Sequence, residues 1–305
     1  MGNYWTQLKV LGCPELSVNS LRSKSTMDAF PAKKVKRPKR AEANFYPSFP
    51  TGETQDSMEK ERIELLTDVK MRNNERVITD KMACTFAYRR QEVVNQEPSI
   101  QDFKDRWPAL FHQKEINAES LRLRLMAVPL EDMFFAQLDI HSSQLIRVIR
   151  AKGGSTRQKN ADIMDILDQT EDIHLRRECV LKAIFLGEDA DDLIKEYRDS
   201  GPEDIQRDLE HLTVAVFVIR KDGEGPQEPP EDIGIVIEGV KVLHGLTSVA
   251  SACALLLGLL YALNLAYPKP LRFTFEVLQK IIMHLEQHKM SPKVQNLYGR
   301  LQSSQ

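Results

Sequence analysis

The sequence predicts a mainly α-helical (α+β) globular domain with a small two-stranded β element, behind a disordered basic N-terminal tail. Apolar residues recur at helical spacing through most of the chain, two short β-rich runs occur after residue 212, and the first 52 residues show no sustained period. At 305 residues, with 42% hydrophobic and 28% charged residues, the composition is typical of globular proteins. A chain of this length can bury a large apolar core.

Residues 1–52 are expected to form a flexible tail, because their Ser, Pro and Lys bury too little apolar surface to offset the entropy cost of ordering. The tail contains a basic cluster, six cations within eight residues: Lys33, Lys34, Lys36, Arg37, Lys39 and Arg40. Charge repulsion and Pro38 favour an extended segment, as the groove of a nuclear-import receptor or a phosphate backbone requires. Nuclear import is the preferred interpretation. The alternative is a solvated basic segment that no receptor binds.

Residues 53–98 are expected to form a long charged helix followed by a linker. Asp56 and Glu59 have the spacing of a capping box, and the helix should run from there towards Tyr88. The apolar stripe Ile78, Met82 and Phe86 within it is expected to pack on the chain's own domain rather than on a partner helix.

Residues 99–301 are expected to form the helical globular domain. Ser99 and Asp102 predict a capped short helix that ends at Trp107, because the following proline disfavours helical geometry there. The strongest helix signal covers residues 130–152, ended by the Gly153-Gly154 pair, with five positions at helical spacing: Phe134, Leu138, His141, Leu145 and Val148. Glycine or proline breaks separate further predicted helices at 162–167, 173–185, 191–197 and 203–212.

The pattern changes near residue 213. β-Branched and alternating apolar residues predict two strands, near 213–220 and 233–238, joined by an exposed loop rich in Gly and Pro. After Pro270, an amphipathic helix is expected with five apolar positions: Leu271, Phe275, Leu278, Ile282 and Leu285. Ser291-Pro292 should then open a final short helix.

The stretch 249–267 could be read as a membrane span, because it is mostly apolar and lies in a region without charged residues. Ser251, Gly258 and Asn264 interrupt it, and no cluster of cations flanks one end. A central buried helix is therefore preferred over a single-pass anchor.

No residue pattern defines a catalytic, cofactor or metal site. His284 and His288 stand four apart on the predicted helix, but the glutamate that a zinc-hydrolase motif needs after the first histidine is absent. Gly153-Gly154 follows a helix rather than the strand that a phosphate-binding loop requires. The four widely spaced cysteines argue against a disulfide framework or zinc module, and no secretory signal peptide is expected in residues 1–10.

Several phrases resemble a group of uncharacterised fish proteins described as sterile alpha motif domain-containing protein 3-like. They include 40–47 (RAEANFYP), 52–56 (GETQD), 85–90 (TFAYRR), 106–111 (RWPALF), 115–119 (EINAE), 176–180 (RRECV), 230–236 (PEDIGIV) and 274–280 (TFEVLQK). The likeness spans roughly residues 39–301, and segment 183–188 is shorter than the family pattern. The chain has no recognisable sterile alpha motif, so the resemblance implies no catalytic residue, self-association or RNA contact here. The resemblance also favours the interpretation of residues 249–267 as a buried helix of the globular domain.

Together these observations predict a non-enzymatic protein-interaction module in the nucleus, or otherwise in the cytoplasm, with no cofactor. Its expected partners are a protein of unknown identity and an import receptor that binds the basic tail. One alternative is a nucleic-acid-associated protein that uses the same tail, although the net charge of −2 gives no overall attraction to phosphate. The other two alternatives are a single-pass membrane protein anchored by residues 249–267 and an enzyme whose site is assembled from distant residues.

Overall fold

The computed structural model describes residues 47–125, 127–151, 161–184, 187–198, 201–221, 223, 225 and 228–302. This part is mainly helical with one small sheet, which confirms the predicted fold class. The α-helices are α2 (Gln55–Asp68), α3 (Glu75–Cys84), α4 (Phe86–Gln96), α5 (Ile100–Arg106), α6 (Gln113–Arg122), α7 (Leu130–Arg150), α9 (Ala161–Gln169), α10 (Ile173–Ala183), α11 (Pro202–Leu209), α12 (Val249–Ala262), α13 (Arg272–Val277) and α14 (Pro292–Gln302). The strands are β1 (Ile194–Arg198), β2 (Val214–Arg220), β3 (Asp232–Ile237) and β4 (Val240–Leu243).

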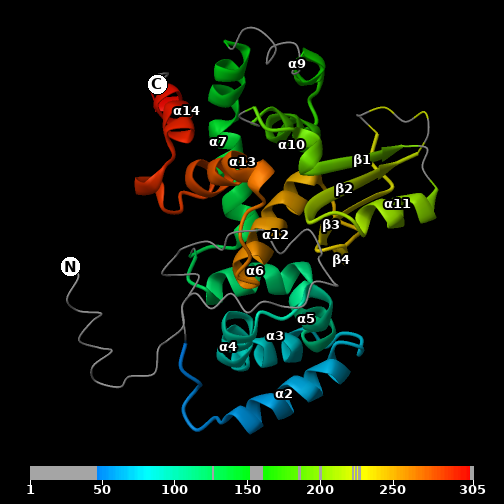
Figure 1. The fold of residues 1–305 in the computed structure, drawn as a ribbon, viewed down its shortest axis with the longest axis vertical. Helices are drawn as coiled ribbons and strands as arrows, with labels where there is room; N and C mark the ends of the chain where they lie inside the picture. The colour runs from blue at the N-terminus through cyan, green and yellow to red at the C-terminus, as the bar shows by residue number, and fades with distance from the viewer. Residues whose placement is uncertain are drawn as a thin grey trace, which may run out of the picture.

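The helices form two groups on either side of α12 (Figure 1). Helices α2 to α6 lie at one end, and α7, α9, α10, α13 and α14 lie towards the other. The sheet stands beside α12, with α11 on its outer face. A single large hydrophobic core runs through both groups, and a small second core lies between α11 and the sheet.

The long helix predicted from Asp56 towards Tyr88 is wrong, because three helices occupy this segment. The first break is at Asn73, which takes a left-handed backbone conformation with φ of 59°. The second is at Thr85, whose side-chain hydroxyl donates to the backbone carbonyl of Lys81 and so competes with helical hydrogen bonding. The N-terminal cap is also not the predicted one, since Thr54 and Ser57 form the capping box of α2.

The next elements agree more closely with the sequence. Ser99 caps α5 by accepting the backbone N–H of Asp102 at 3.1 Å, and the helix ends at Trp107 as predicted. Helix α7 ends at Arg150, and the Gly153-Gly154 pair lies outside the described residues. Helices α9, α10 and α11 correspond to the segments predicted at 162–167, 173–185 and 203–212.

The sheet has four strands rather than two, in the order β1-β2-β3-β4. Strand β1 pairs in parallel with β2, and the other pairs are antiparallel. The helix predicted over 191–197 is therefore wrong: the exposed residues Glu196 and Arg198 of β1 alternate with less exposed ones, which suits an edge strand whose outer side chains stay in water. Strand β4 was missed because only the Glu238-Gly239 turn, with φ of 52° and 75°, separates it from β3.

Helix α12 is the centre of the core. All fourteen of its residues are buried, and it packs against α6, α7, α10 and the strands β2 and β3. Gly258 allows the closest approach, because a Cβ built there would lie 2.5 Å from Leu130 Cδ2 and 3.0 Å from Ile116 Cγ2. Among the described residues, no helix combines the length and apolar character needed to cross a bilayer.

The predicted amphipathic helix after Pro270 is only partly correct. Residues Leu271, Phe275, Leu278 and Ile282 are buried as expected. The α-helical geometry ends at Val277, and residues Leu278–Ile282 form a π-helical turn. The final helix begins at Pro292 as predicted.

Candidate functional site

The basic cluster Lys33 to Arg40 lies outside the described residues, so its role stays a prediction. His284 and His288 are described but do not share a helix face. His284 follows the π-helical turn with φ of 56°, and His288 lies in a short 3₁₀ turn, Gln287–Lys289. Across the described ranges, no group of three or more His, Cys, Asp or Glu side chains is arranged to hold a metal ion.

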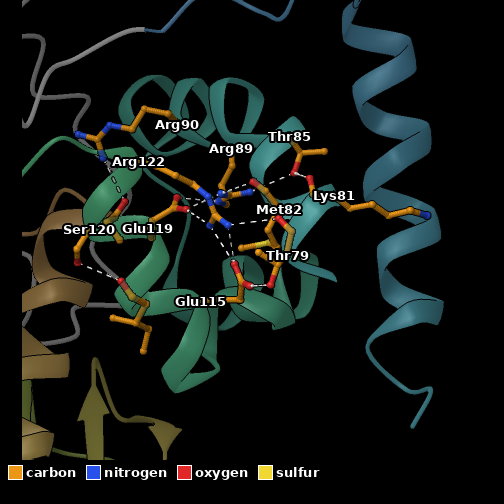
Figure 2. Close-up of polar contacts among 12 residues, drawn as sticks. Thr79, Lys81, Met82, Thr85, Arg89, Arg90, Glu115, Glu119, Ser120 and Arg122 are labelled. Carbon is orange, nitrogen blue, oxygen red and sulfur yellow. Dashed lines mark hydrogen bonds and ion pairs between the residues drawn. The ribbon is translucent and has the colours of Figure 1, made fainter. Parts of the chain in front are cut away.

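The most elaborate polar arrangement surrounds Arg89 in α4, which is 1% exposed. Its guanidinium donates to both carboxylate oxygens of Glu119 in α6, from Nε at 3.0 Å and from Nη2 at 2.7 Å. Nη2 also donates to the carbonyl of Met82, and Nη1 to the hydroxyl of Thr85, as Figure 2 shows. The guanidinium carbon lies 5.2 Å from the ring centre of Trp107. One side chain thus joins α3, α4 and α6.

A second arginine extends this network towards the surface. Arg122 donates to Glu119 Oε2 at 3.0 Å and to Glu115 Oε2 at 3.0 Å (Figure 2). The hydroxyl of Thr79 in α3 donates to the other oxygen of Glu115 at 2.7 Å. We call these five residues, Thr79, Arg89, Glu115, Glu119 and Arg122, the buried charge network.

The electrostatics of the network favour its charged form. Burial alone would raise the pKa of Glu119, but the charges and hydrogen bonds of Arg89 and Arg122 outweigh it, so the pKa is lowered. Both carboxylates of the network are occupied by N–H or O–H donors. Such an arrangement holds helices in register rather than offering a reactive group.

A second polar cluster shares Trp107 with the first. The indole Nε1 donates to Glu92 Oε2 at 3.1 Å, and Arg106 Nε donates to the same oxygen at 2.8 Å. Arg106 also donates to Glu59 in α2, and the hydroxyl of Tyr88 donates to Glu59 at 3.0 Å. This cluster fixes α2 and α5 to α4.

Hydrogen bonds from Arg62 are the largest influence on Glu59 and lower its pKa, partly opposed by burial. With Arg106 and Tyr88 also donating, the pKa of Glu59 falls to about 2.

Residues 58–112, from within α2 to the end of the 3₁₀ turn after α5, lie around this second cluster. They match the family model of sterile alpha motif domain-containing protein 3, helical domain. This match supports the relationship that the sequence phrases indicated, over part of the chain. No curated protein and no solved structure matches the chain.

The helical-domain match does not contain the whole buried charge network. Arg89 and Thr79 lie within residues 58–112, whereas Glu115, Glu119 and Arg122 come from α6, just beyond the match. The matched helices are therefore held to the next helix by ion pairs that cross the edge of the match.

Arg90, next to Arg89, ties the matched helices to the central core. Its Nη1 donates to the carbonyl oxygens of Tyr261 at 3.2 Å and Ala262 at 3.1 Å, at the C-terminal end of α12. A cation is favourable there, because the last carbonyls of a helix lack partners within the helix and carry partial negative charge.

His141 in α7 makes an edge contact with His284, with ring centres 5.9 Å apart. Both ring nitrogens of His141 are buried and have no hydrogen-bond partner among the described residues. Burial lowers the pKa of His141, and the nearby His284 lowers it further. A protonated ring here would place an unpaired charge inside the protein.

We expect this histidine to make stability depend on pH. Because its pKa is lower in the folded state, the unfolded chain binds the proton first as the pH falls through the ordinary histidine range near 6.5. Stability should therefore fall between about pH 7.5 and 5.5, and His141→Leu should reduce this loss. Thermal unfolding at several pH values measures it, with His244→Leu, an exposed histidine, as control. An unchanged slope in His141→Leu would contradict the prediction.

Proposed function

We propose that the chain is a non-enzymatic protein-interaction module that acts in the nucleus. Its interaction surface lies on α2 and α3, the outer helices of the region that matches the helical domain. The observation that carries the proposal is the contrast between the fixed position of these helices and their exposed apolar side chains. The ion pair of Glu59 with Arg106 fixes α2, and the hydrogen bond from Thr79 to Glu115 fixes α3. Large apolar side chains of the same two helices nevertheless remain exposed.

Three of these exposed apolar residues lie within fifteen positions of each other. Ile63 on α2 and Met71 in the following turn are each 54% exposed, and Val77 on α3 is 41% exposed. Exposed apolar groups on a rigid support lose little entropy on binding, which favours contact with a protein surface. The occupant that fits best is an apolar helix face of another protein.

The test compares Ile63→Glu/Val77→Glu with Ile173→Glu, which changes a 43% exposed isoleucine of α10 in the same way. Partners of the tagged full-length chain are identified by cross-linking in cells, and one is then produced pure for a binding titration. We expect the double variant to weaken binding at least tenfold and Ile173→Glu to leave it unchanged. Equal binding by all three proteins would contradict the proposed surface.

The nuclear part of the proposal rests on the basic cluster. We expect the full-length chain with a fluorescent tag to accumulate in the nucleus, and a variant with all six cations of Lys33 to Arg40 changed to alanine to lose this accumulation. A cytoplasmic wild-type protein would contradict it. Binding to DNA or RNA that disappears in the same variant and weakens steeply with salt would favour the nucleic-acid alternative.

A further inference from the structure

A depression of about 320 Å³ lies where the π-helical turn meets the start of α14. Its lining includes Tyr267, Arg272, Glu276, Lys280, Lys289 and Ser291. These residues come from the loop before α13, from α13 and the π turn, and from the segment that leads into α14. It is separate from the α2–α3 surface proposed above.

The lining has an excess of positive charge. Its single carboxylate, Glu276, accepts hydrogen bonds from Lys280 Nζ at 2.8 Å and from the backbone N–H of Ser291 at 2.6 Å. Burial would raise the pKa of Glu276, but these contacts outweigh it and keep the group charged. Lys280 is therefore already paired within the protein.

The other two cations are not neutralised. Arg272 and Lys289 are exposed and form no ion pair with any residue in the described ranges. Arg272 rests over the ring of Phe273 at 5.2 Å, which restricts its position. Two cations that face one small depression without a carboxylate partner are suited to an anion that carries more than one negative charge.

Helix α14 begins directly after Ser291, which lines the depression. The backbone N–H of Ser291 is already used by Glu276, and its hydroxyl accepts the backbone N–H of Val294, so the preference for an anion rests on the two cations. The π turn Leu278–Ile282 contributes Gln279 and Lys280 to the lining, and such turns are frequent at functional sites.

We propose that this depression binds a phosphate monoester group. The ligand is a dianion at neutral pH with acceptor oxygens for Arg272 and Lys289, and a space of about 320 Å³ accommodates a phosphoryl group with a small substituent. The phosphoryl group can come from a phosphorylated side chain of a partner or from a small free phosphate. The chemistry of recognition is the same for both.

The experiment titrates the full-length chain with inorganic phosphate and, separately, with a phosphoserine peptide, using calorimetry at low ionic strength. Arg272→Gln and Lys289→Gln should each weaken binding about tenfold, and the double variant should abolish it. Lys293→Gln is the matched control, because Lys293 lies 4.4 Å from the Phe273 ring but does not line the depression. Its binding should equal that of the wild type.

The two titrations distinguish the sources of the ligand. Tighter binding of the peptide than of phosphate supports a phosphorylated side chain, and binding of phosphate alone supports a small free ligand. Unfolding temperatures within a degree or so of the wild type show that the variants are folded. Absence of binding for both probes, or binding that Arg272→Gln and Lys289→Gln leave unchanged, would overturn the proposal.

Discussion

Replacing Arg89 by methionine is expected to lower the free energy of unfolding by about 3 to 5 kcal/mol. The change leaves Glu119 buried without its bidentate partner, and only the bond from Arg122 remains. A buried carboxylate that loses its main partner must either stay charged at high cost or take up a proton. Denaturant unfolding of the two proteins at pH 7 measures the difference.

Two further variants separate the buried ion pair from a general effect of losing an arginine. Arg89→Met/Glu119→Leu removes both charges and should recover most of the lost stability, because apolar groups of similar size can replace a buried ion pair. Arg150→Met breaks an exposed pair with Asp168 and should cost less than about 1 kcal/mol. If Arg89→Met/Glu119→Leu were as unstable as Arg89→Met, the loss of stability would come from altered packing rather than from the unpaired charge of Glu119.

Gly258→Val in α12 is expected to cost about 3 kcal/mol. A glycine inside a helix is normally unfavourable, so adding a side chain usually helps. Here a Cβ would come within 2.5 Å of Leu130 and 3.3 Å of Ser120, inside a core that has no room to move. Thermal and denaturant unfolding both report the change.

Gly299→Val is the matched control, because Gly299 lies inside α14 and a Cβ there meets nothing within 4 Å. Its stability should stay within about 0.5 kcal/mol of the wild type. If both valine variants lost the same stability, the cost would come from the helix backbone, and the proposed close packing of α12 on α6 and α7 would be incorrect.

Much of the helical fold could be predicted because apolar spacing reports burial directly. The 249–267 stretch was correctly expected to include a buried helix, and α7 agrees with its apolar stripe. The errors occur where a local feature decides the structure. Asn73 and Thr85 divide one charged stretch into three helices, and the pairing of β1 with β2 gives a strand where a helix was predicted over 191–197.

The candidate sites were harder to predict. Arg89 and Glu119 are thirty positions apart, and no periodicity connects residues on two helices that meet only in the folded chain. A signal was nevertheless present, since the phrases 85–90 and 115–119 that carry the family resemblance contain Arg89 and Glu119. Arg272 and Lys289 gave no signal, because isolated cations are common on every protein surface.

The central position of α12 also has a consequence for biosynthesis. Helix α6 emerges from the ribosome more than a hundred residues before α12, so its apolar face remains without its main packing partner until residue 262 has been translated. The carbonyls of Tyr261 and Ala262, to which Arg90 donates, are also absent until then. We therefore expect the packing of α6 on α12 to form only after α12 has left the exit tunnel.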